Sequence, residues 1–142
     1  MAEECGRPFN AIVFSGLGEG EFYVSIYAKR FREKLGIIPY PGTLNTRIRD
    51  PREVEVFNKC LKRADSVYIE PPVIPGAKLG AVYAYRAEIE GLDAWIVRPV
   101  ITAYKGDVVE FISEQYLRGI LFLEDGDNIR FRIVNRIGTT GR

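Results

Sequence analysis

The stretch Leu79–Val100, LGAVYAYRAEIEGLDAWIVRPV, has the pattern of a β-hairpin. Its first half is rich in β-branched and aromatic residues, and it alternates Val82 and Ala84 with Tyr83 on the opposite face. A turn at Gly91 then leads into the apolar run AWIVRPV, which we interpret as the partner strand. The sequence therefore predicts two neighbouring antiparallel strands here.

Further strand patterns lie on both sides of this hairpin. They are short, rich in β-branched and aromatic residues, and separated by turn residues such as those of the EDGD segment. The segment from Tyr116 to Phe122 fits neither a strand nor a helix clearly. Strands are predicted over Phe9–Ser15, Phe22–Ser25, Thr43–Arg49, Val108–Ile112 and Ile129–Ile133.

Two helical patterns interrupt the strands. Residues 27–35 (YAKRFREKL) repeat apolar residues every four positions, which predicts a helix that ends at Gly36. Asp50 followed by Pro51 is a helix start, and an apolar stripe follows it. Because strand patterns dominate and the helices do not alternate with them, we expect a mainly β fold, a small barrel with about two short inserted helices.

Length and composition restrict the class of protein. The chain has 142 residues, of which 46% are hydrophobic and 27% charged, so we expect one globular domain over residues 1–142 with a core near residues 9–134. No apolar run approaches the roughly 20 residues of a membrane helix, and the first residues lack a signal-peptide pattern. We therefore expect a cytoplasmic protein.

Charge and the absence of one residue type exclude several functions. The net charge of +1 gives no electrostatic reason to expect a nucleic-acid partner. The chain has no histidine, which excludes imidazole acid–base catalysis and imidazole metal ligands. Cys5 and Cys60 are isolated, and we expect two ordinary thiols, with a disulfide as the alternative. The single glutamine and the many charged residues are typical of a thermophilic source.

The first candidate site is the glycine-rich segment SGLGEGEFY that follows the first strand. Gly16, Gly18 and Gly20 stand at alternate positions, where they allow close approach of a ligand to the backbone. Successive N–H groups in such a loop can bind an anion. The spacing is that of neither a Rossmann nor a Walker motif, and a flexible hairpin loop remains the alternative.

The second candidate site is the segment PYPGTLN. Thr43 and Asn45 stand two apart at the start of a predicted strand, so their side chains share one face. A hydroxyl and a carboxamide oxygen are hard, neutral ligands, and Mg²⁺ commonly combines a few such ligands with water and phosphate oxygens. The alternative is that both residues only cap a turn.

The third candidate is the pair Thr102 and Glu110. Glu110 lies within the apolar strand VVEFI, where alternation alone would expose it to water. If it instead faces a cleft, burial raises the pKa of the carboxyl group and makes it a better base. Local sequence leaves both possibilities open.

Together these motifs resemble the archaeal CTP-dependent riboflavin kinase family. The chain carries GLGEGEFYVS, then LG-x-x-PYPGTLN, then a threonine and a glutamate separated by seven residues, followed by YLR and a DGD turn. The resemblance covers roughly residues 12–134, and PYPGTLN and the G-x-G-E-G loop are its most specific parts. It implies a six-stranded cradle-loop barrel that transfers the γ-phosphoryl group of CTP to the ribityl 5′-hydroxyl of riboflavin.

The resemblance also implies residue roles. Thr43 and Asn45 would bind Mg²⁺, and Thr102 and Glu110 would contact the flavin, with Glu110 as a candidate catalytic base. The partners would be riboflavin or FMN and CTP or CDP, with no nucleic acid and no membrane. We expect a monomer, although the sequence does not determine the oligomeric state. The nucleotide would be bound by Gly16, Leu17, Gly18, Glu19, Gly20, Glu21, Gln115, Tyr116, Leu117 and Arg118.

Departures from the family pattern and rival functions remain. Ala103 stands where many members have a histidine, and EPPVIPG is unusually rich in proline. The helix-turn-helix segment that precedes some members is not expected here. One rival is a non-catalytic barrel that binds nucleotide, flavin or RNA; the other is an ATP-dependent flavokinase, which also uses a threonine–asparagine pair. Nothing in the residues themselves distinguishes CTP from ATP.

Overall fold

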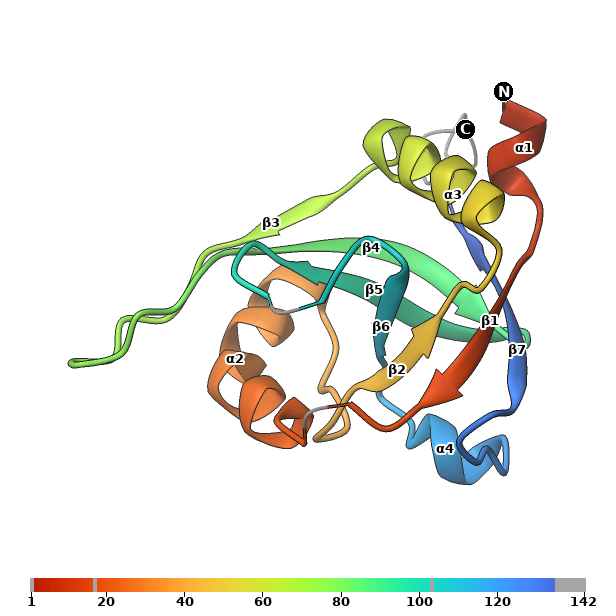
Figure 1. Ribbon diagram of the computed structural model, residues 1–142. Helices are drawn as coiled ribbons and strands as arrows, with labels where there is room; N and C mark the ends of the chain where they lie inside the picture. The colour runs from red at the N-terminus through yellow and green to blue at the C-terminus, as the bar shows by residue number, and fades with distance from the viewer. Residues whose placement is uncertain (1, 17, 103, 135–142) are drawn as a thin grey trace.

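The computed structural model describes residues 2–16, 18–102 and 104–134, and its centre is a closed antiparallel β-barrel (Figure 1). The strands run in the order β3-β4-β5-β6-β2-β1-β7, and pairing of β4 with β7 closes the barrel, so that β3 lies outside the closed ring of six. This confirms the expected mainly β class. The strands are β1 (Phe9–Phe14), β2 (Leu44–Arg47), β3 (Val67–Ile69), β4 (Val82–Ile89), β5 (Leu92–Pro99), β6 (Val108–Ile112) and β7 (Asn128–Ile133).

Helices flank the barrel. The predicted helix at residues 27–35 is confirmed but begins earlier, so the strand predicted over Phe22–Ser25 is wrong. The four-residue apolar spacing extends back from Tyr27 to Tyr23, and the short apolar run between them is compatible with either structure. The helices are α1 (Ala2–Gly6), α2 (Gly20–Leu35), α3 (Pro51–Arg63) and α4 (Leu117–Ile120).

Local signals set the helix ends. Gly36 ends α2 in the left-handed conformation, with φ of 72°, and its N–H donates to the Arg32 carbonyl. Asp50 caps α3, because its carboxylate accepts a 2.9 Å hydrogen bond from the Arg52 N–H. None of the described helices is long and apolar enough to cross a membrane.

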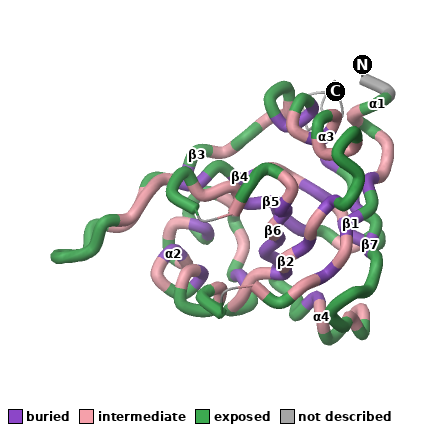
Figure 2. The backbone as a smooth tube through the Cα atoms, in the orientation of Figure 1, coloured by how far each residue is buried: buried purple, intermediate pink, exposed green. Residues whose placement is uncertain are grey.

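The sheet is buried on both faces over part of its area. Inside the barrel, Phe9 and Phe131 pack with Phe57 of α3, with 5.6 Å between ring centroids in each pair. Outside it, Val24, Tyr27 and Phe31 of α2 form a second cluster with residues of β3, β4, β5 and β6. This second layer explains why residues 94–97 (AWIV) are all buried, in purple in Figure 2.

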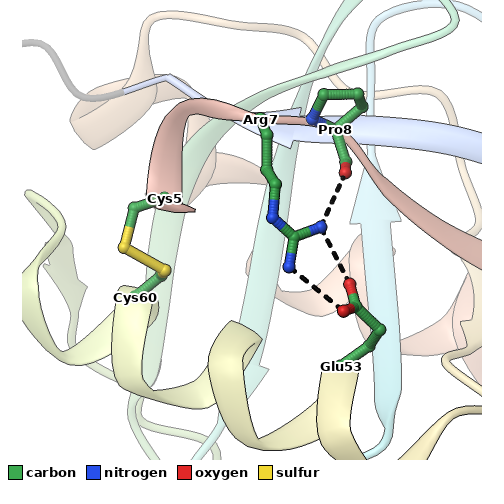
Figure 3. Close-up of a disulfide and its surroundings, with 5 residues drawn as sticks. All are labelled: Cys5, Arg7, Pro8, Glu53 and Cys60. Atoms are coloured by element: carbon green, nitrogen blue, oxygen red, sulfur yellow. Dashed lines mark hydrogen bonds and ion pairs between the residues drawn. A yellow bond between two sulfur atoms is a disulfide. The ribbon is translucent and has the colours of Figure 1, made fainter. Parts of the chain in front are cut away.

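The cysteines are joined, contrary to the expectation of two ordinary thiols. Cys5 of α1 and Cys60 of α3 form a disulfide, and beside it the Arg7 guanidinium donates to both carboxylate oxygens of Glu53, at 2.9 and 3.1 Å (Figure 3). The partners are 55 residues apart, so the sequence alone gave no spacing signal for the bond. Together these contacts fix the N-terminal helix against α3.

Loss of this disulfide is expected to destabilise the fold without changing the site. Closing a loop of 55 residues restricts the unfolded chain, which corresponds to about 4 kcal/mol in the chain-entropy description. The Cys5→Ser variant should therefore unfold at lower denaturant concentration than the oxidised wild type, by roughly that free energy. Reductant should shift the wild type to the variant's midpoint and leave the variant unchanged. Equal midpoints for oxidised wild type and variant would contradict a stabilising disulfide.

Candidate functional site

The candidate site lies on the outer surface of the barrel, where β2 and β6 pair. Asn45 and Glu110 are opposite one another in this pair. Their chain neighbours Leu44 and Phe111 belong to the barrel core, so alternation turns Asn45 and Glu110 outward. The outward face is not fully open to water here, because the N-terminal end of α2 borders it, together with Pro99, Ile101, Thr102 and Tyr104. The Glu110 side chain therefore points outward, as strand alternation predicts, and it also lies in a cleft.

The glycine-rich loop packs directly against the two predicted metal ligands. A side chain at Gly16 would collide with the Asn45 amide, and a Cβ at Gly20 would lie 2.7 Å from the Thr43 hydroxyl oxygen. Gly18, between them, has φ of 81°, a conformation that other residues rarely adopt. Geometry thus favours glycine at positions 18 and 20, and Gly16 lies directly against the Asn45 and Tyr104 side chains, which is not expected of a flexible hairpin loop.

The loop ends at the N-terminus of α2. Glu19 precedes the helix, and its side chain does not cap the first N–H groups. The N-terminus of a 16-residue helix carries a partial positive charge and suits an anionic oxygen. Since Gly20 contacts Thr43, this end of α2 is adjacent to the threonine–asparagine pair.

Thr43 and Asn45 have the donors and the placement for a magnesium site. The Thr43 hydroxyl donates a 3.4 Å hydrogen bond to the Asn45 side-chain oxygen. Two adjacent ligands of an octahedral Mg²⁺ ion lie roughly 3 Å apart, so one ion can contact both oxygens. No group of three or more acidic, cysteine or histidine side chains that could hold a metal occurs in residues 2–16, 18–102 and 104–134. The neutral pair therefore fits an ion whose other ligands are water and phosphate.

Glu110 is half-buried, and its ionisation is affected by that burial. Burial raises the pKa of Glu110 to about 7, and the positive charge of Arg98 partly opposes the shift. Arg98 is itself held in place, because its guanidinium donates to Asn58 at 3.0 Å and to the Gly106 carbonyl at 3.1 Å. A carboxylate with a pKa near neutrality is suited to accept a proton at physiological pH.

The raised pKa of Glu110 also predicts a pH-dependent stability. The folded protein binds the proton of the Glu110 carboxyl group more tightly than the unfolded chain does. The contribution of this tighter binding to the free energy of unfolding is therefore complete below about pH 4.5, and it is lost as pH rises through about 7. This contribution of Glu110 to the free energy of unfolding is at most about 3 kcal/mol. In metal- and ligand-free buffer, the free energy of unfolding of Glu110→Gln should rise relative to wild type between pH 5 and pH 8. A pH-independent difference would contradict burial of this carboxyl group.

Two cavities meet at Thr43. One, of about 300 Å³, contains Glu110, Asn45 and Thr102. The other, of about 280 Å³, contains residues 115–118. Thr43 lines both. The arrangement offers room for two ligands whose reacting ends approach the same threonine.

A network of polar contacts fixes the start of the glycine loop. The Arg118 guanidinium pairs with Asp125 at 2.7 Å, and Asp125 accepts a 2.7 Å hydrogen bond from the Ser15 hydroxyl. Arg118 also donates to the Phe14 carbonyl at 3.4 Å. Arg118 therefore lines the second cavity and at the same time holds the start of the glycine loop in place.

The structure brings most predicted site residues together. Thr102 is exposed at the rim of the first cavity, and its hydroxyl accepts a 3.1 Å hydrogen bond from the Tyr104 N–H. Glu19 and Gly20 also line that cavity, whereas Gly18 and Glu21 are exposed and line neither. Leu17 lies outside the described residues. Gln115, Tyr116, Leu117 and Arg118 all line the second cavity.

Three aromatic residues of the site, Tyr23, Tyr40 and Tyr104, had no role assigned from the sequence, whereas Tyr116 did. Tyr40 and Tyr116 stack with ring centroids 4.6 Å apart in the second cavity, and Tyr104 packs edge-on against Phe14 beside the first. Tyr23 also lines the first cavity. The position of Tyr40 inside PYPGTLN was the one available sequence signal.

Comparison with known proteins gives consistent matches. Residues 13–133 match the protein family CTP-dep_RFKase, described as a domain of unknown function, DUF120. A riboflavin kinase from Aeropyrum pernix is 53% identical over 133 residues, which cover 93% of this chain and 98% of that protein. Riboflavin kinases from Archaeoglobus fulgidus and Pyrococcus abyssi are 43% and 41% identical over 86% of this chain. The aligned regions cover 52% and 56% of those two proteins.

Proposed function

The chain belongs to the CTP-dependent riboflavin kinase family, and from this premise we propose that it phosphorylates riboflavin to FMN with CTP as donor. The observation that carries the proposal is the meeting of the two cavities at Thr43, beside Asn45 and Glu110. A kinase must bring an acceptor hydroxyl and a nucleotide phosphate to one point. A simple binding barrel requires no such junction.

We assign riboflavin to the cavity of Glu110 and Thr102, and CTP to the cavity of residues 115–118. The first cavity contains the buried carboxylate that an acceptor hydroxyl needs. The second contains the stacked pair Tyr40 and Tyr116, whose ring faces suit a planar base. The triphosphate would extend from there towards Thr43 and the adjacent N-terminus of α2, whose first N–H groups would donate to it.

The reaction then follows from positioning and charge. The ribityl O–H gives its proton to the Glu110 carboxylate, its oxygen bonds to the γ-phosphorus, and the bond to the β–γ bridging oxygen breaks to release CDP. The side-chain oxygens of Thr43 and Asn45 would hold Mg²⁺, which would supply positive charge to stabilise the transferring phosphoryl group. The N–H groups of α2 donate to the same phosphate, and Arg98 keeps the ionised form of Glu110 accessible near neutral pH.

The test is product formation with each nucleotide. The protein is incubated with riboflavin, Mg²⁺ and either CTP or ATP, and FMN is separated by chromatography. FMN with CTP and little or none with ATP is the expected result. FMN with ATP alone would replace the proposal by an ATP-dependent flavokinase. If no FMN forms with either nucleotide, the proposal is wrong, and the protein is better described as a non-catalytic barrel that binds a ligand.

A further inference from the structure

The hydroxyl group of Tyr23 is buried and has no hydrogen-bond partner. Within residues 2–16, 18–102 and 104–134, it is the one buried side-chain nitrogen or oxygen atom without a hydrogen-bond partner. Buried polar groups in folded proteins are almost always hydrogen-bonded, so each exception needs an explanation. A phenylalanine at this position would fill the same space without the cost of an unpaired hydroxyl.

The ring of Tyr23 is held firmly in place. It packs against Tyr27, with centroids 4.9 Å apart, and against Phe31 at 6.4 Å, all three on one face of α2. The hydroxyl of Tyr27 provides a contrast, because it donates a 2.6 Å hydrogen bond to the Gly80 carbonyl. Two tyrosines one helical turn apart thus differ in one respect: the hydroxyl of Tyr27 has an internal partner and that of Tyr23 does not.

Tyr23 is also part of the wall of the Glu110 cavity. It lines this cavity together with Thr43, Asn45 and Glu110. Burial raises the pKa of Tyr23, and the charges of Glu110 and Tyr27 act in the same direction. The phenol therefore stays protonated and keeps a proton to donate to an acceptor that enters the cavity.

We propose that Tyr23 is a positioning residue, whose hydroxyl donates a hydrogen bond to an oxygen of the hydroxyl-rich chain of the acceptor substrate. This inference rests on the proposed function, because it takes the acceptor in this cavity to be riboflavin and the oxygen to be one of its ribityl hydroxyls. The phenol is shielded from water in the ligand-free protein. Ile101 and Thr102 at the cavity rim are exposed, and the hydrogen bond would form once the substrate chain has entered past this rim and packs against the wall.

The test compares Tyr23→Phe with the matched variant Tyr27→Phe. Riboflavin affinity is measured from the change in flavin fluorescence on binding, CTP affinity by calorimetry, and stability by thermal unfolding of the ligand-free protein. For Tyr23→Phe we expect roughly tenfold weaker riboflavin binding, because one donor to the substrate is lost, with unchanged CTP binding and no loss of stability. For Tyr27→Phe we expect a lower unfolding temperature, because its bond to Gly80 is lost, and a smaller change in riboflavin affinity.

Three outcomes would overturn the inference, and they are distinguishable. If Tyr23→Phe binds riboflavin as the wild type does, the hydroxyl has no role in substrate positioning, whereas the proposed function stands. The same conclusion follows if Tyr23→Phe loses stability as Tyr27→Phe does, because the hydroxyl then has an internal partner. If the wild type itself does not bind riboflavin, both the inference and the proposed function fail.

Discussion

Glu110→Gln is expected to lower the kcat of FMN formation by roughly 10²- to 10⁴-fold, the usual contribution of a general base. Glutamine has nearly the same shape, but it cannot accept the proton of the ribityl hydroxyl at neutral pH. Since Glu110 lines the acceptor cavity and not the cavity of residues 115–118, the KM for CTP should stay within a few-fold of wild type. Steady-state kinetics with chromatographic detection of FMN measures both values.

Glu88→Gln is the control for this substitution. Glu88 is also a partly buried carboxylate on a barrel strand, but it lies on β4 and lines neither cavity. Its variant should keep nearly the full kcat. If Glu110→Gln retains a kcat near that of wild type, Glu110 is not the base, and its burial in the cavity has another cause.

Thr43→Val is expected to lower the rate of phosphoryl transfer roughly 100-fold at a fixed Mg²⁺ concentration. It should also raise the Mg²⁺ concentration needed for half of the maximal rate. Valine keeps the shape of threonine and removes the hydroxyl oxygen that lies 3.4 Å from the Asn45 oxygen. The loss corresponds to about 2.7 kcal/mol of transition-state stabilisation, a modest part of what a metal contributes next to a phosphoryl group. Initial rates over a Mg²⁺ titration measure the effect.

Thr46→Val, three residues further along in β2, provides the matched control. The Thr46 hydroxyl is buried inside the barrel and donates a 2.9 Å hydrogen bond to the Val109 carbonyl. That variant should lose stability but keep the wild-type dependence on Mg²⁺ below its unfolding temperature. Thr43→Val with a normal Mg²⁺ dependence would show that Thr43 only terminates a turn.

The strands of the fold could be predicted well from the sequence, and the reason is visible at β4 and β5. Their composition and the turn at Gly91 are local signals, and the antiparallel pairing joins residues close in the chain. By contrast, β3 has only three residues, and the bond between Cys5 and Cys60 depends on contact between α1 and α3. Such long-range contacts leave no periodic pattern in the sequence.

The sequence predicted which residues belong to the candidate site, but it did not predict how they are arranged and buried. The spacing of Thr43 and Asn45 predicted that their side chains share one face of a strand; in the structure Thr43 directly precedes β2, Asn45 lies within β2, and both line the same cavity. The sequence did not show that α2 covers this face, because the residues at the start of α2 have the pattern of a strand and were predicted as one. For the same reason the burial of Glu110 and the unpaired hydroxyl of Tyr23 became evident only once the helix was in place.

The most direct test of the two-cavity arrangement is a pair of amide chemical-shift titrations on ¹⁵N-labelled protein. Riboflavin alone should shift the amides of Thr102, Tyr104 and Glu110, and CDP with Mg²⁺ should shift those of residues 115–118. Thr43, which lines both cavities, should respond in both titrations. If both ligands shift one and the same set of amides, or if Thr43 responds to neither, the two substrates do not meet at Thr43 and the account is wrong.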